Sequence, residues 1–181
     1  IGWFLSSMNT VREKEIGTIE QINVTPIKKH HFIIGKLVPF WLIALGELGF
    51  GLILGRLLFQ IPIVGSLGLL FGVAGIYLLA VMGLGLFIAN LVTTQQQSMF
   101  ISWFFAMIFI LMSGLFTPIE SMPEWARMVN YINPIAYFIK IIRMIMLKGS
   151  GFMDILPHFA SLAAYSVIII GLASWRYRKI A

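Results

Sequence analysis

The chain has 181 residues, of which 59% are hydrophobic and only 11% are charged, whereas an ordinary soluble domain is about 25% charged. Its mean hydropathy is +0.93, and no Asp, Glu, Lys or Arg occurs between Leu57 and Ile119. A soluble fold cannot bury so long an apolar stretch, but a bilayer can. The composition therefore excludes a soluble globular domain and indicates an integral membrane protein.

The net charge of +6 does not predict nucleic-acid binding, because the basic residues flank apolar segments and form no continuous stripe. The absence of cysteine excludes disulfides, Cys-based zinc sites and iron–sulfur ligation. The sequence also lacks the His-Glu-x-x-His zinc motif and the Gly-x-Ser-x-Gly nucleophile motif. We therefore expect neither a metal site nor a catalytic site of its own in this chain.

The chain begins with Ile and an apolar stretch, and it has no signal-peptide pattern. We interpret residues 1–8 as the end of a span that begins upstream. The chain is then expected to be the C-terminal part of a larger membrane protein.

Residues 9–36 form a polar segment between this stretch and the first complete span, and they contain two helix-start signals. Thr10 with Glu13 fits a capping box, in which a hydroxyl and an acidic or amide side chain close the first helical turn. Thr18 with Gln21 fits a second capping box. Two short helices are therefore expected in this segment.

The second of these helices has clear limits. Gly17 is expected to interrupt the backbone before it, and Thr25-Pro26 should end it, because a residue before proline avoids the helical region. The sequence thus predicts a short helix over residues 19–24 at the membrane surface.

Four segments have the length and hydropathy of membrane-spanning helices, which need roughly 20 apolar residues. They are residues 37–59, 67–90, 99–116 and 155–175. Polar turns are expected between them at residues 60–66 and 93–98.

Four spans place both ends of the chain on one side of the membrane. Eight basic residues lie on that side: Arg12, Lys14, Lys28, Lys29, Lys36, Arg176, Arg178 and Lys179. Five lie on the other side: Arg56, Arg127, Lys140, Arg143 and Lys148. Because basic residues are enriched on the cytoplasmic side, both ends are predicted to be cytoplasmic.

Residues 118–151 contain the start signals of two short helices, the second of which is too short and too charged to cross the membrane. Ser121, Pro123 and Glu124 fit a capping box with an early proline, which predicts a short helix that ends near Asn130.

Asn133 and Pro134 are expected to cap a second helix, which ends at Gly149. Its many apolar residues favour a re-entrant or interfacial helix pair at the outer face. An ordinary amphipathic surface helix is the alternative.

Two ionisable residues lie within the first predicted span. Glu47 is near its middle, where an acidic residue costs about 2.5–3.5 kcal/mol on insertion scales. We expect it either to form structural hydrogen bonds or to line a water-filled cavity. Arg56 is nine residues farther on, on the opposite helical face, and is expected to extend towards the outer interface.

Residues 12–27 (REKEIGTIEQINVTPI) resemble the cytoplasmic signature of ABC-2 type transporter permeases, particularly the drug-exporter-like branch. Residues 113–123 (SGLFTPIESMP) resemble the end of the fifth span of that family, and Asn133, Pro134 and Arg143 fit the short external helices that follow. The resemblance covers essentially the whole chain. It implies an all-α polytopic bundle of the type V exporter kind.

In this family the segment before the third span contains the coupling helix, which docks on the ATP-binding subunit. The resemblance assigns coupling to Glu15, Gly17, Thr18, Glu20, Gln21, Thr25 and Pro26. It also implies that the span at 99–116 lines the transport path. Trp103 and Phe104 are therefore candidates for that path, and the alternative for the aromatic residues is contact with lipid. Glu47 is a further candidate because a charge within a span needs a partner or water, and structural hydrogen bonding is its alternative.

The resemblance implies a permease subunit of an exporter in the plasma membrane, which moves a hydrophobic or amphiphilic substrate. Its expected partners are an ATP-binding subunit, a second permease copy or homologue, and membrane lipids. ATP and Mg²⁺ would bind to the ATP-binding subunit, because the sequence has no Gly-x-x-x-x-Gly-Lys-Ser/Thr phosphate loop. An ion-gradient-driven transporter and a non-transporting scaffold are the alternatives.

Overall fold

The computed structural model describes residues 2–17 and 29–176, and every regular element in these ranges is a helix. The elements are α1 (Gly2–Ile16), α3 (Lys29–Phe59), α4 (Leu67–Leu91), α5 (Gln95–Met112), a 3₁₀ turn η1 (Ile119–Ser121), α6 (Glu124–Asn130), α7 (Pro134–Lys148) and α8 (Phe152–Arg176). The predicted all-α class is confirmed.

Four helices in the described part of the chain are long and apolar enough to cross a membrane. They comprise Ile33–Phe59, Leu67–Leu91, Gln95–Met112 and Phe152–Trp175. These helices correspond to the four predicted spans, although the boundaries differ by several residues.

α3 begins at Lys29 instead of residue 37, and both boundaries of α5 differ from the predicted 99–116. The sequence predicts a turn through residue 98, but Thr94 caps the helix and its hydroxyl accepts a hydrogen bond from the Gln97 N–H. The three glutamines that follow Thr94 therefore form the first turn of α5. The helix also ends at Met112 instead of residue 116, because Ser113 and the left-handed Gly114 (φ 82°) terminate it.

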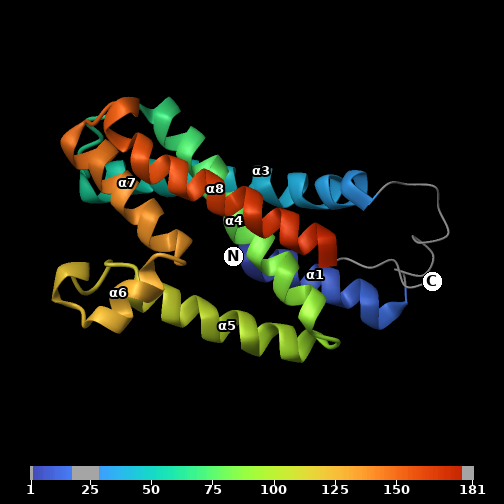
Figure 1. Ribbon diagram of the computed structural model, residues 1–181. Coiled ribbons are helices and arrows are strands. Elements are labelled where there is room, and N and C mark those ends of the chain that lie inside the picture. Colours follow the sequence, from blue (N-terminus) through green and yellow to red (C-terminus); the bar gives the residue numbers. More distant parts are fainter. Residues whose placement is uncertain (1, 18–28, 177–181) are drawn as a thin grey trace.

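α4 is the central helix of the bundle, with α1 and α8 packed along it (Figure 1). Small residues allow these close approaches. A Cβ at Gly85 would lie 2.5 Å from the Trp3 carbonyl oxygen of α1, and one at Gly83 would lie 2.9 Å from Ile169 of α8. The largest buried cluster joins α4 to α7 and α8 and comprises Leu70, Val73, Ala80, Ile141, Ile145, Ile155 and Leu162.

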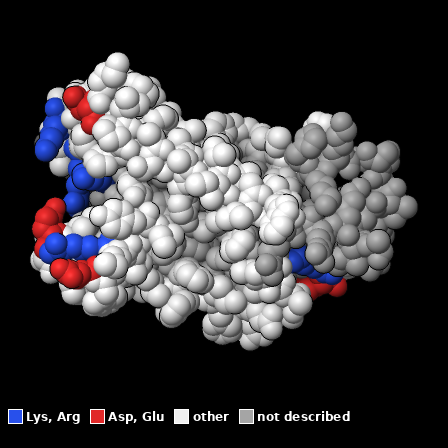
Figure 2. All heavy atoms as spheres, viewed as in Figure 1, with Lys and Arg blue, Asp and Glu red and all other residues white. Residues whose placement is uncertain are grey.

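α3 and α5 flank this core, and Figure 1 shows them on opposite sides of α4. Most of their large apolar side chains are exposed. Figure 2 shows charged residues at the two ends of the bundle, with an uncharged surface between them on this face. This distribution fits a bilayer around the middle of the bundle.

The predicted capping box at Ser121 is wrong. The Ser121 hydroxyl donates to the Pro118 carbonyl at 2.7 Å, within the 3₁₀ turn η1. α6 starts only at Glu124, with Pro123 in the capping position and no side-chain cap. A local serine-to-backbone bond thus replaces the cap, a competition that is common for serine.

The second helix of this region follows the sequence pattern closely. The Asn133 side chain accepts from the Ile135 N–H at 3.0 Å, Pro134 is the first residue of α7, and Gly149 ends the helix in the left-handed conformation (φ 63°). α7 packs against α4 and α8. Residues 113–151, which include α6 and α7, are called the α6–α7 end below.

Candidate functional site

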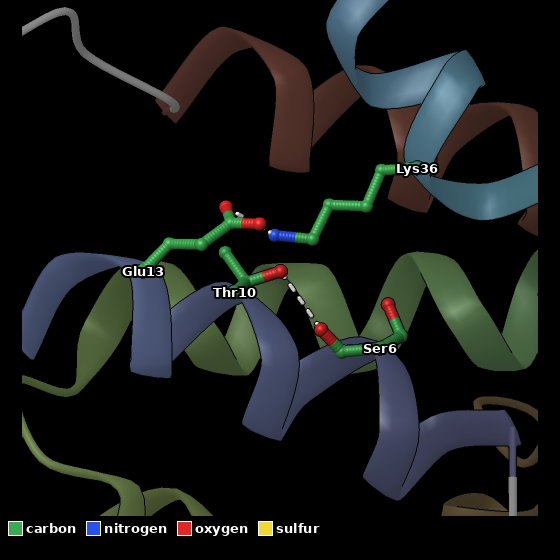
Figure 3. Close-up of polar contacts among 4 residues, drawn as sticks. All are labelled: Ser6, Thr10, Glu13 and Lys36. Carbon is green, nitrogen blue, oxygen red and sulfur yellow. Dashed lines mark hydrogen bonds and ion pairs between the residues drawn. The ribbon is translucent and has the colours of Figure 1, made fainter. Parts of the chain in front are cut away.

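α1 is one continuous helix that leads directly to the predicted coupling segment. It runs from Gly2 to Ile16, so the capping box predicted at Thr10 is wrong. The Thr10 hydroxyl instead donates to the Ser6 carbonyl at 2.8 Å within the helix (Figure 3). The helix ends where Gly17 adopts φ 78° and donates its N–H to the Lys14 carbonyl at 3.2 Å.

Most of the predicted coupling residues lie outside the described residues. They are Thr18, Glu20, Gln21, Thr25 and Pro26. Of the predicted coupling set, the structure describes Glu15 and Gly17, at the end of α1. The end of α1, with the contacts of its last residues, is therefore the described part of the candidate site.

Glu13 connects α1 to α3. The Lys36 Nζ donates to the Glu13 Oε2 at 2.6 Å (Figure 3), and the side chains are 7% and 24% exposed, respectively. This ion pair joins the two helices on either side of residues 18–28. Such a partly desolvated pair is screened less than a surface pair.

Lys14 connects α1 to the last turn of α4. Its ammonium group donates to the carbonyl oxygens of Ala89 and Val92, the latter at 3.4 Å. A cation interacts favourably with the partial negative charge at a helix C-terminus. Burial, and secondarily the nearby Lys36 charge, lower the pKa of the Lys14 ammonium group.

Glu15 connects α1 to the first turn of α5. Its Oε1 accepts from the Gln95 backbone N–H at 2.8 Å, and its Oε2 accepts from the Gln95 side-chain amide. These side-chain and backbone hydrogen bonds lower the pKa of the exposed Glu15 carboxyl group. A carboxylate at a helix N-terminus also matches the partial positive charge there.

Three consecutive residues thus bind three different helices at the same end of the bundle. Neighbouring positions on a helix point about 100° apart, so Glu13, Lys14 and Glu15 face α3, α4 and α5, respectively. We call these three residues with their partners the α1 anchor. A displacement of the end of α1 would act on three other helices at once.

Hydroxyl groups continue the polar contacts of α1 towards the middle of the bundle. Ser6 donates to the Met82 carbonyl at 3.1 Å, and the hydroxyls of Ser7 and Ser98 hydrogen-bond to each other. The Trp3 Nε1 and the Ser102 Oγ are buried and have no hydrogen-bond partner within the described part of the chain.

The candidates for the transport path do not form one site. Glu47 lies exposed on α3, whereas Trp103 and Phe104 are each 57% exposed on α5, on the other side of α4 (Figure 1). Ser121, Pro123, Asn133 and Pro134 lie at the α6–α7 end, far along the chain from the α1 anchor.

At the α6–α7 end, the buried Asn133 and the exposed Arg143 bind backbone carbonyl groups. The Asn133 side-chain amide donates to the Phe109 carbonyl at 2.8 Å and to the Asn130 Oδ1 at 3.1 Å. Arg143 donates to the Gly114 carbonyl at 2.9 Å. These bonds attach α7 to the end of α5.

No group of three or more His, Asp or Glu side chains in residues 2–17 and 29–176 is arranged to hold a metal ion. The polar side chains described above instead join helices to one another.

Residues 1–175 match the sequence profile of the family described as ABC-2 family transporter protein. The chain belongs to the ABC-2 transporter family. The resemblance of residues 12–27 and 113–123 to ABC-2 permeases is therefore confirmed at the level of the family.

The chain is also similar to named ABC-2 relatives. It is 38% identical over 147 residues to the probable multidrug ABC transporter permease YbhR of Escherichia coli K12, covering 81% of this chain and 40% of YbhR. It is 30% identical over 180 residues to the probable multidrug ABC transporter permease YbhS of the same strain, covering 99% of this chain and 48% of YbhS. The inner membrane transport permease YhhJ of that strain is 27% identical, with coverages of 97% and 47%.

The chain therefore spans less than half the length of these curated relatives. No solved structure matches it significantly.

The sequence patterns missed most of the α1 anchor. They singled out Glu15 but neither the Glu13–Lys36 pair nor the contacts of Lys14 with α4. One signal was present: Glu13, Lys14 and Glu15 are consecutive charged residues on a helix and cannot share one partner. Three separate partners could have been expected from this spacing, although not their identities.

Proposed function

We propose that this chain is part of the permease subunit of an ABC exporter that moves a hydrophobic or amphiphilic substrate across the membrane. ATP hydrolysis in a separate ATP-binding subunit would drive the transport. The ABC-2 family match, the names of the relatives and the four apolar helices support this proposal. It concerns the whole protein, of which this chain is a part.

The observation that carries the proposal is the α1 anchor. Residues 18–28 connect the end of α1 to the start of α3, and the family resemblance makes them the segment that docks on the ATP-binding subunit. The Glu13–Lys36 pair holds together the two helices that flank this segment. Lys14 and Glu15 extend the connection to α4 and α5.

This geometry supports a mechanism for coupling. When the ATP-binding subunits close on ATP, they would move residues 18–28, and α1 would transmit the movement to the ends of α3, α4 and α5. Several spans would then change their packing together, as alternating access requires. ATP and Mg²⁺ would be held entirely by the ATP-binding subunit.

The proposal includes the assembly and its orientation. Two permease copies, or one with a homologue, would assemble with two ATP-binding subunits in the bacterial inner membrane. The α1 anchor and the C-terminal end of α8 would face the cytoplasm, and the α6–α7 end would face outward, whereas Gly2 at the start of α1 lies beside Met82 inside the bundle. The excess of basic residues near the chain ends supports this orientation.

A charge exchange at the Glu13–Lys36 pair tests the function. The full-length protein would be reconstituted with its ATP-binding subunit, and ATP-dependent transport would be measured for Glu13→Lys, Lys36→Glu and the double variant. Each single variant places like charges together and should reduce transport per ATP hydrolysed by about tenfold or more, given how strongly close like charges repel. The double variant should recover most of the coupling.

Arg12→Gln is the matched control, because Arg12 is exposed on the same turn of α1; it should couple normally. Transport driven by an ion gradient without ATP would overturn the proposed function. So would a protein that binds the ATP-binding subunit but transports nothing under any condition.

A further inference from the structure

α3 has a continuous exposed face in the middle of its membrane span. Its members follow the i, i+3, i+4, i+7 pattern that places residues on one side of a helix. They are Ile43, Gly46, Glu47, Phe50, Gly51 and Leu54, and all are exposed. We call these six residues the α3 face.

The other side of α3 provides its contacts with the bundle. Trp41 donates its indole N–H to the Gly75 carbonyl of α4 at 2.9 Å, and Leu48 and Leu52 pack against the main apolar cluster. The α3 face therefore points away from the core of the described bundle.

Glu47 is the only ionisable residue of the α3 face. Within the described residues it has no hydrogen-bond or ion-pair partner. Arg56 cannot pair with it along the helix, because nine positions place the two side chains on opposite faces. A carboxylate at this depth is costly unless a counter-charge or water compensates it.

The surroundings of Glu47 fit an organic cation. Phe50 lies one turn further along, about 60° around the helix, and is 65% exposed. A carboxylate supplies charge, and an aromatic ring adds a cation–π interaction. A Cβ placed on Gly46 or on Gly51 would meet nothing within 4 Å, so space is open beside the carboxylate.

The apolar members of the α3 face indicate the chemistry of the uncharged part of the ligand. Ile43 and Leu54 are 54% and 37% exposed and offer apolar contacts on either side of the charged group along the helix. A hydrated metal ion would gain nothing from these side chains. An anion would be repelled by Glu47.

We propose that the α3 face binds lipophilic organic cations that arrive through the bilayer, with Glu47 as the counter-charge and Phe50 as the aromatic contact. The inference rests on the proposed function and gives its substrate class: amphiphiles that carry a positive charge. Glu47 and Phe50 are then specificity-determining residues of the exporter.

Binding of two ions of matched shape tests this inference. Tetraphenylphosphonium and tetraphenylborate have nearly the same size and opposite charges. Their equilibrium binding would be measured on the full-length permease with its ATP-binding subunit in lipid nanodiscs, with empty nanodiscs subtracted. Glu47→Gln should weaken tetraphenylphosphonium binding by about tenfold or more, and Phe50→Leu should weaken it less, about threefold.

Two further variants make the result specific. Glu47→Asp keeps the carboxylate and should retain more cation binding than Glu47→Gln. Glu124→Gln removes an exposed carboxylate of α6, outside the membrane spans, and should change nothing. Tetraphenylborate binding should be the same in all variants.

The inference fails if Glu47→Gln binds tetraphenylphosphonium normally, or if it loses both ions equally. It also fails if Glu47→Gln separates two permease copies, because Glu47 would then serve a helix–helix contact. Binding at equilibrium needs no ATP, so this result is independent of the coupling experiment. A failure of coupling with intact cation selectivity would overturn the proposed function alone.

Discussion

At the α6–α7 end, Asn133 and Arg143 bind backbone carbonyl groups of neighbouring segments. At the opposite end of the bundle, the α1 anchor joins α1 to three helices mainly through charged side chains, two of them on helix termini. At the α6–α7 end Asn133 is fully buried and Arg143 is exposed, whereas in the α1 anchor Glu15 is exposed, Glu13 is partly exposed and Lys36 is largely buried. The exposed Glu15 contact can be exchanged for contacts with water at small cost, but the buried Asn133 amide cannot.

This difference separates a fixed end from an adjustable end. At the α6–α7 end, the contacts of Asn133 hold α7 against α5 and fix the residue at which α7 begins. The α1 anchor holds together helices that a moving segment must be able to displace. We expect functional movement to occur at the α1 anchor and rigidity at the α6–α7 end.

The largest expected effect is all-or-none and concerns which side of the membrane each end faces. Single cysteines at Val64 and Ser150, near the α6–α7 end, should react with an impermeant maleimide in intact cells. A cysteine at Gln96, beside the α1 anchor, should react only after permeabilisation. The chain has no native cysteine, so each signal comes from one site. Reaction of Gln96→Cys in intact cells would reverse the proposed orientation.

The second prediction tests the fixed end. Asn133→Ala removes the cap of α7 and leaves the buried Phe109 carbonyl without its donor. It should lower the free energy of unfolding by about 2–4 kcal/mol, the sum of a lost cap and an unsatisfied buried group. Denaturant titration of the detergent-solubilised protein measures this loss. Transport per folded molecule should stay constant, and a fall in coupling would contradict the assignment of rigidity to this end.

Asn133→Ser is the matched control. Its hydroxyl can still cap α7 but is too short to reach the Phe109 carbonyl in the same way, so an intermediate loss of stability is expected.

The fold was largely predictable because hydropathy and length determine where helices can cross a bilayer. The predicted helix boundaries were wrong where a local polar side chain determines the end of a helix. At α5, the cap at Thr94 recruits glutamines that a hydropathy pattern assigns to a turn. At Ser121, a bond to the Pro118 carbonyl competes with the cap.

The site was less predictable because its contacts are distant in sequence. Glu13 meets Lys36, 23 positions away, whereas Glu15 meets Gln95, 80 positions away. Lys14 binds backbone carbonyl groups at the end of α4. Every residue has such a group, so no residue type in the sequence identifies this partner. Packing of α1 between α3, α4 and α5 determines these partners, and no local pattern contains it.

The third prediction concerns the adjustable end. Glu13→Gln removes the charge that faces Lys36, a largely buried side chain, while keeping the shape of the side chain. It should lower the free energy of unfolding by about 1–2 kcal/mol, between the values for surface and buried pairs. The fractional loss of transport per ATP hydrolysed should be larger than the fractional loss of the free energy of unfolding.

Denaturant titration and measurements of transport per ATP hydrolysed, made on the same preparation, compare these two losses. Arg12→Gln should leave both quantities unchanged. A loss of stability as large as that of Asn133→Ala, without a loss of coupling, would erase the distinction between the two ends.

The smallest expected effect is a pH dependence at Glu15. Hydrogen bonds from Gln95 lower the pKa of this carboxyl group in the folded protein below its ordinary value of about 4.3. The contact therefore contributes stability that is fully present above the ordinary pKa and is lost as pH falls through the lowered pKa of the folded state. At neutral pH the first turn of α5 should be held by Glu15.

The backbone amide signal of Gln95 in a ¹⁵N-labelled sample reports this titration directly. Its midpoint should lie below the ordinary glutamate value, and the titration should disappear in Glu15→Gln. Because Glu15 is exposed, the effect should be local: α5 should fray at its first turn in acid, while the Asn133 contacts at the other end of α5 stay intact. A midpoint at or above the ordinary value would show that Gln95 does not bind the carboxylate, and the α1 anchor would then hold only α3 and α4.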